Sequence, residues 1–158
     1  MSRPARIADR SPPLALSGRR LALLALGIVP WTILVAPGGT TLVFPWGLFD
    51  PTTLHVTTLP DYLFVLTSGL PGRLIAWPVS VLCYLFALAS AFAGRFEDRR
   101  VTAGLLVLAG ASHASFALGF VFGVAQVGLV VLPLGPVTLW LVAWWFHWPD
   151  LRGALHRG

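Results

Sequence analysis

Long apolar runs separated by short polar segments dominate this chain of 158 residues. Four runs are long enough to cross a membrane, at about residues 20–36, 74–93, 101–122 and 129–148. A helix crosses the hydrocarbon core of a bilayer with about 20 apolar residues. The first run is shorter, but Arg19 and Arg20 at its start can reach the lipid headgroups. The pattern predicts an all-α membrane protein with four transmembrane helices.

The segment between the first two runs, about residues 37–72, is predicted to be the first extracellular loop. Thr58 and Asp61 have the spacing of a capping box, in which each side chain satisfies the other residue's backbone at the start of a helix. Apolar residues then recur at helical spacing as far as Leu70. We therefore expect a short amphipathic helix over about residues 59–68, lying on the membrane or on the helix bundle.

The charges divide unequally between the two sides of the predicted membrane. All eleven basic residues are arginines, as a GC-rich genome could produce, and only Arg73 falls in the outer loop. Positive residues gather on the cytoplasmic side of membrane proteins, so both termini are expected in the cytoplasm. The net charge of +5 then needs no nucleic acid as a partner. The domains expected are a flexible cytoplasmic tail (1–18), a transmembrane domain (19–149) and a second cytoplasmic tail (150–158).

The first apolar run also has the features of a secretory leader, because arginines precede it. No pair of small residues with cleavage-site spacing precedes Pro37, and three further apolar runs follow. An uncleaved membrane anchor is therefore the expectation that we prefer.

His113 is the residue with the clearest functional potential, because it lies about 18 Å into the third run. Ionisable groups near the bilayer midplane are rare, and they usually face protein or water. A neutral imidazole is less costly there than a buried Arg or Asp, and neighbouring helix carbonyls can accept its proton. We favour a structural hydrogen-bonding role over a proton relay or a ligand or cofactor contact.

No other pattern in the sequence predicts catalysis, a cofactor or a metal. His113 and His147 differ in predicted depth by about 15 Å, so one haem or one zinc cannot join them. His55 lies in the outer loop near Asp50 and Asp61, a set too sparse for a metal site. The single cysteine, Cys83, lies within an apolar run. A non-enzymatic protein is expected, and an enzyme acting at the outer surface through His55, Asp50 and Asp61 is the least favoured reading.

Two further features concern helix packing. Small residues four apart lie on one face of the third run, and they are Ala111, Ser115, Gly119 and Gly123. Such a face lets helices approach closely in lipid, either between subunits or, as we prefer, within one bundle. The fourth run contains Pro133 and Pro136, which should break its outer half, and broken helices form binding sites in transporters.

Four strings resemble a small family of multi-spanning membrane proteins of halophilic archaea that has no assigned activity. They are Leu42-Val43-Phe44-Pro45-Trp46-Gly47, residues 54–59, residues 97–104 and Trp144-Trp145-Phe146-His147-Trp148-Pro149. The resemblance implies an archaeal cell membrane and carries over no functional residue.

The expected function is that of a non-enzymatic subunit or accessory protein. Its expected partners are the lipid bilayer and other membrane subunits or further copies of itself. The alternative is a small transporter or channel component built on His113 and the break at Pro133–Pro136.

Overall fold

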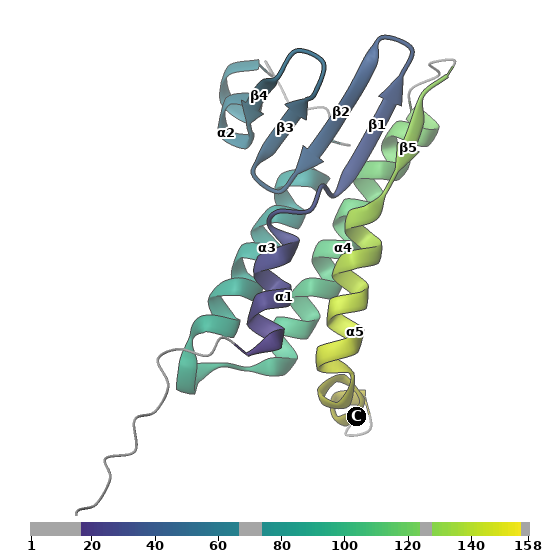
Figure 1. Ribbon diagram of the computed structural model, residues 1–158. Coiled ribbons are helices and arrows are strands. Elements are labelled where there is room, and N and C mark those ends of the chain that lie inside the picture. The colour runs from purple at the N-terminus through teal and green to yellow at the C-terminus, as the bar shows by residue number, and fades with distance from the viewer. Residues whose placement is uncertain (1–16, 67–73, 124–127, 156–158) are drawn as a thin grey trace, which may run out of the picture.

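A five-stranded antiparallel sheet caps one end of a bundle of helices in the computed structural model, which describes residues 17–66, 74–123 and 128–155 (Figure 1). The helices are α1 (Gly18–Leu26), α2 (Leu59–Asp61), α3 (Ala76–Phe92), α4 (Arg99–Gly123) and α5 (Leu134–Leu155). The strands are β1 (Thr32–Ala36), β2 (Gly39–Phe44), β3 (Gly47–Asp50), β4 (His55–Thr58) and β5 (Val130–Leu132). A π-helical turn, Tyr62–Leu66, follows α2, and a 3₁₀ turn, Gly94–Phe96, precedes α4.

The sheet has the strand order β4-β3-β2-β1-β5, and every neighbouring pair is antiparallel. Two-residue turns join β1 to β2 and β2 to β3, because Ala36 pairs with Gly39 and Phe44 pairs with Gly47. A side chain at Gly47 would collide with the backbone of Thr57 on β4. Glycine is therefore what allows β3 and β4 to approach closely at this point.

The bundle beneath the sheet contains most of the core. Its fully buried large side chains come from α1, α3, α4, α5 and the segment before β1, and they include Leu23, Trp31, Trp77, Leu106 and Leu139. At the end far from the sheet, Asp98 caps α4 by accepting a hydrogen bond from the Arg100 backbone at 2.9 Å. The Thr102 hydroxyl donates to Ser90 on α3 at 2.9 Å, which ties α3 to α4.

The prediction of an all-α fold is wrong, and the first apolar run shows the physical reason. The run at 20–36 holds a helix only as far as Leu26, and strand β1 begins at Thr32. Pro30 lies between them, and proline cannot donate the hydrogen bond that a continuing helix needs. The residues that follow include β-branched Thr32, Ile33 and Val35, which favour strands.

The fourth apolar run is divided in the same way. It opens with β5, and α5 begins two residues later, at Leu134. Pro136 consequently lies in the first turn of α5, where a backbone N–H has no acceptor within the helix. The predicted break inside a membrane helix is therefore a junction between a strand and a helix. At its other end α5 reaches Leu155, within the predicted cytoplasmic tail.

The predicted extracellular loop forms most of the sheet instead of an irregular segment. Strands β2, β3 and β4 all lie within it. One half of the predicted capping box is present, since the Asp61 backbone donates to the Thr58 hydroxyl at 3.3 Å. In place of the other half, the Thr58 hydroxyl donates to the Asp61 carboxylate at 2.6 Å. The last part of the predicted amphipathic helix, from residue 67, lies outside the described residues, as does the N-terminal tail as far as residue 16.

The prediction of a multi-pass protein with four membrane-spanning helices is also wrong. Among the described residues, one helix, Arg99–Phe122, is both long enough and apolar enough to cross a bilayer. Two other apolar helical segments, Ala76–Phe92 and Leu134–Phe146, are shorter than that length. The apolar residues that suggested two further spans are shared between helices and strands.

Candidate functional site

His113 lies at the junction where the sheet meets the helices, and its side chain is fully buried. Its Nε2 is 2.8 Å from the Thr32 hydroxyl on β1, and its Nδ1 is 3.4 Å from the Ser80 hydroxyl on α3. The Ser80 hydroxyl donates its hydrogen to the Trp77 carbonyl at 2.6 Å, so it can only accept from His113. A neutral His113 with the hydrogen on Nδ1, accepting from Thr32 at Nε2, satisfies all three groups.

Trp31 is the second residue of this junction, and it contacts both His113 and α1. Its ring meets the His113 ring edge-on at 5.1 Å, and its Nε1 donates to the Leu26 carbonyl at 2.9 Å. The Trp31 backbone N–H donates to Val43 on β2 at 2.7 Å. One buried residue therefore connects the end of α1, the sheet and α4.

Gly135 completes the junction from α5. Its backbone N–H donates to the Trp31 carbonyl at 2.6 Å. A Cβ at this position would lie 2.7 Å from the Trp31 Cβ and 2.9 Å from the His113 Cδ2. The helix can approach this closely only because residue 135 has no side chain. We call Trp31, Thr32, Ser80, His113 and Gly135 the junction cluster.

The polar residues predicted on the outer surface do not gather into one site. His55 pairs with Asp50 across β3 and β4 at one end of this hairpin, whereas Asp61 follows the other end of β4, about 10 Å along the strand. The Asp50 carboxylate accepts from the Thr52 hydroxyl and backbone, which holds its pKa below the usual range. The Asp61 carboxylate is occupied by Thr58. Each acid thus serves local backbone structure.

The predicted row of small residues on α4 does not form its most buried face in the part that the structure describes. Ala111 and Ser115 are exposed, and Gly119 is half-buried. Gly123 is the last residue of α4. The residues that α4 turns toward α3 and α5 are instead Leu106, Ala109, His113 and Phe116, all of them buried. This placement leaves the small-residue face open to a neighbour outside the chain.

The opposite end of the bundle is held by charges. Glu97 forms ion pairs with Arg19 and with Arg20, the second at 3.6 Å. Arg20 also donates to the Ala91 carbonyl at 3.0 Å, and its guanidinium lies over the Phe92 ring. These contacts join the start of α1 to the end of α3. Among the described residues, no three His, Cys, Asp or Glu side chains gather as a metal site would require.

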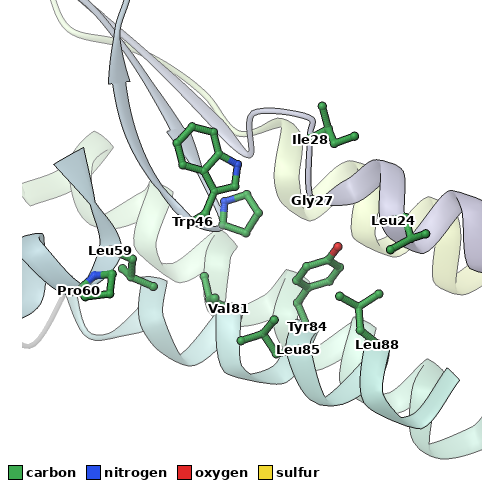
Figure 2. Close-up of a pocket in the computed structure, with 11 residues that line it drawn as sticks. Leu24, Gly27, Ile28, Trp46, Leu59, Pro60, Val81, Tyr84, Leu85 and Leu88 are labelled. Carbon is green, nitrogen blue, oxygen red and sulfur yellow. The ribbon is translucent and has the colours of Figure 1, made fainter. Parts of the chain in front are cut away.

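An apolar groove of about 610 Å³ lies between α1 and α3, below the turn that joins β2 to β3 (Figure 2). Leu24 lines it from α1 and Ile28 from the segment that follows α1, and Val81, Tyr84 and Leu85 line it from α3. Trp46 borders it at the sheet, where its ring stacks on Phe44. The Tyr84 hydroxyl donates to the Leu23 carbonyl at 2.8 Å, so this polar group of the wall is already paired.

Sequence reasoning singled out His113 but missed its partners. Thr32, Ser80 and Trp31 all lie inside apolar runs, where they resemble ordinary packing residues. A buried polar group needs a hydrogen-bond partner, so isolated hydroxyls within apolar runs were the available signal. Gly135 lies between Pro133 and Pro136 of the predicted helix break, and its role depends on how closely two elements approach each other.

The fold and the junction cluster define the class of this protein: a small mixed α/β protein in which an antiparallel sheet is fastened to the end of an apolar helix bundle. The chain belongs to the family defined by a domain of unknown function, DUF8050, whose model matches residues 3–157. No curated protein and no solved structure matches the chain.

Proposed function

We propose that this protein is a non-enzymatic accessory protein or subunit of a cell membrane. Its helix α4 crosses the lipid bilayer, the shorter helices α3 and α5 pack against α4, and the sheet lies at the outer surface. The finer part of the family resemblance, a membrane of halophilic archaea, belongs to this proposal as well. The apolar outer faces of the helices contact lipid and other membrane subunits or further copies of the chain.

The observation that carries this proposal is the exposure of large apolar side chains along α3, α4 and α5. Phe122 is 82% exposed, Trp145 79% and Phe86 61%. Others on the same helices include Leu82, Val107, Leu108, Leu118, Leu141 and Trp144. The largest apolar patch on a typical soluble monomer covers a few hundred Å². An apolar surface that extends over three helices is better matched by a hydrocarbon solvent.

The charges support the proposed orientation. Arg19, Arg20, Arg99 and Arg100 lie at the end of the bundle far from the sheet, where they outnumber Glu97 and Asp98. The acids Asp50 and Asp61 lie at the sheet. Figure 1 places the start of α1 and the end of α5 at that same basic end. The tendency of arginine to stay in the cytoplasm therefore favours a cytoplasmic location for both termini.

The alternative, a transporter or channel component, has less support. His113 is enclosed by hydrogen-bonded and aromatic neighbours, and Pro133 and Pro136 flank the start of α5 without interrupting it. An enzyme at the outer surface has less still, because His55, Asp50 and Asp61 do not converge.

Membrane extraction tests the location. We expect tagged protein to stay in the pellet after alkaline carbonate treatment of membranes and to leave it in detergent. Release by carbonate alone would contradict the proposal. In a Cys83→Ala background, an impermeant thiol reagent should label Thr52→Cys on intact cells and should label Arg99→Cys only after lysis. The reverse labelling would overturn the orientation.

A second experiment tests the accessory role. Native mass spectrometry of protein purified in mild detergent should show a defined complex, either with another membrane subunit or with further copies. A monomer that binds a solute and supports its flux into vesicles would favour the transporter instead.

A further inference from the structure

We propose that the groove between α1 and α3 holds one hydrocarbon chain of a membrane lipid. This inference rests on the proposed location of the helices in a bilayer. It goes further by assigning a binding site and the chemical class of its ligand.

The chemistry of the wall selects an uncharged, apolar ligand. The groove is lined by aliphatic and aromatic side chains and two prolines, and none of its lining residues carries a charge. The hydroxyl of Tyr84 already donates to the Leu23 carbonyl. A ligand with polar groups would lose its hydrogen bonds to water and gain none here, which is costly. A hydrocarbon chain complements this charge-free wall.

The size and shape of the groove favour a chain over a protein helix. Its volume of about 610 Å³ falls within the range of about 300–1,000 Å³ found for small-molecule sites. A helix with its side chains is about 10–12 Å wide, and a helix bound in the groove would have to extend beyond both ends of it. Trp46 and Pro60 border the groove at the sheet end, as Figure 2 shows, and stand in the path of such a helix.

The groove is continuous with the surface that we place in lipid. Leu85 belongs to its wall and is also 50% exposed, and Phe86 beside it on α3 faces outward. A lipid chain can therefore enter sideways from the bilayer without crossing a polar layer. At the other end of the groove lies Trp46, on the turn between β2 and β3. Tryptophan is enriched at the level of lipid headgroups, so this end fits the point where a chain joins its headgroup.

The experiment compares two tryptophan substitutions on α3 that differ in their place relative to the groove. Leu85→Trp fills the groove, and Phe86→Trp adds an indole on the exposed surface outside it. Both positions are exposed, so both variants should keep the unfolding midpoint of the wild type. Each protein, purified in mild detergent, is titrated with palmitoyl-oleoyl phosphatidylcholine and analysed by native mass spectrometry.

We expect wild type and Phe86→Trp to retain one phosphatidylcholine after the detergent is removed. The affinity of Leu85→Trp should fall about tenfold, since losing the burial of about two methylene groups suffices for that change. Equal lipid binding by all three proteins, or dimers without lipid in place of lipid-bound monomers, would overturn the assignment. Carbonate extraction of membranes that contain these proteins distinguishes a failure of the lipid site from a failure of the membrane location. A protein that stays in the pellet but binds no lipid refutes only the groove, whereas a released protein refutes the membrane location.

Discussion

The two ends of the helix bundle are held together by different kinds of interaction. At the sheet end, the junction cluster joins α1, α3, α4 and α5 through neutral hydrogen bonds and aromatic contacts that are fully buried. At the far end, Arg19, Arg20 and Glu97 join α1 to the bundle through ion pairs whose side chains remain in part exposed. The same short helix is thus held by apolar packing at one end and by charge at the other.

The comparison suggests which conditions each end tolerates. Buried neutral contacts depend on close packing, so they are sensitive to changes of volume and insensitive to salt. Ion pairs near the surface contribute little and weaken as ionic strength rises. We therefore expect the junction cluster to dominate stability and the charged end to adjust it.

Trp31→Ala should have the largest effect. It removes a fully buried indole with its hydrogen bond to Leu26, and truncations of this size cost about 3–5 kcal/mol. Denaturant titration in detergent measures the free energy of unfolding. Trp145→Ala, which alters an exposed indole, is the control and should cost much less. Similar losses in both variants would mean that the junction is not the anchor.

Gly135→Ala should rank second. The added Cβ would lie within 3 Å of both Trp31 and His113, so α5 must move away. Overpacking costs typically about 1–3 kcal/mol, and we expect the upper part of that range because two aromatic neighbours are affected. The same titration measures it, with Gly104→Ala as the control, because a Cβ at Gly104 meets nothing. A Gly135→Ala variant with the same free energy of unfolding as wild type would show that the junction is loosely packed.

His113→Leu should follow, at about 2 kcal/mol, because the buried Thr32 hydroxyl loses its partner. His113→Gln should cost less, since an amide keeps both a donor and an acceptor. The two unfolding curves distinguish a structural histidine from a functional one. A transport activity that is lost in the Gln variant while the fold is intact would contradict the structural role.

Glu97→Gln should cost only about 1 kcal/mol at low salt, because the ion pairs that it removes are partly exposed. The difference from wild type should shrink in about 1 M salt, where the Debye length is about 3 Å. The loss in Trp31→Ala should stay the same. If the two variants depended equally on salt, the proposed difference between the two ends of the bundle would be wrong.

Ser115→Leu should have the smallest effect, close to zero, because Ser115 is exposed on α4. Ala117→Leu, two residues on and buried, is the matched control and should cost about 1–3 kcal/mol. Unfolding in detergent at low protein concentration measures both. A large loss in Ser115→Leu that depends on protein concentration would show that the small-residue face is a subunit interface.

The apolar runs predicted where helices lie, but they could not separate helix from strand. Residues 74–93 and 101–122 correspond closely to α3 and α4, because each run is unbroken and bounded by polar residues. Residues 20–36 and 129–148 are also strongly apolar, yet each holds a strand beside a helix. Pro30 and the valines at 130 and 131 are local signals for the end of a helix and for a strand. The mean hydropathy over about 20 residues does not retain such signals.

The candidate site was predictable only in part. His113 is conspicuous because it is polar within an apolar run, and the helix cap at Thr58 follows from spacing alone. Thr32 and Gly135 are separated from His113 by many residues, and only the tertiary fold brings them together. The groove is likewise invisible in sequence, since its walls come from separate elements and its lining residues look like core residues.

The pairing of β5 with β1 determines the order in which the sheet can assemble during synthesis. Strands β1 to β4 follow one another as neighbours, so they can pair as soon as residue 58 is available. The other edge of β1 must wait for Val130, and Trp31 must wait for Gly135. At translation rates of about 5–20 residues per second, the interval between residue 58 and residue 130 lasts on the order of 4–14 s. During that interval the unpaired edge of β1 is exposed to other chains, which is a hazard for unpaired strands. The last third of the sequence therefore protects the first during synthesis.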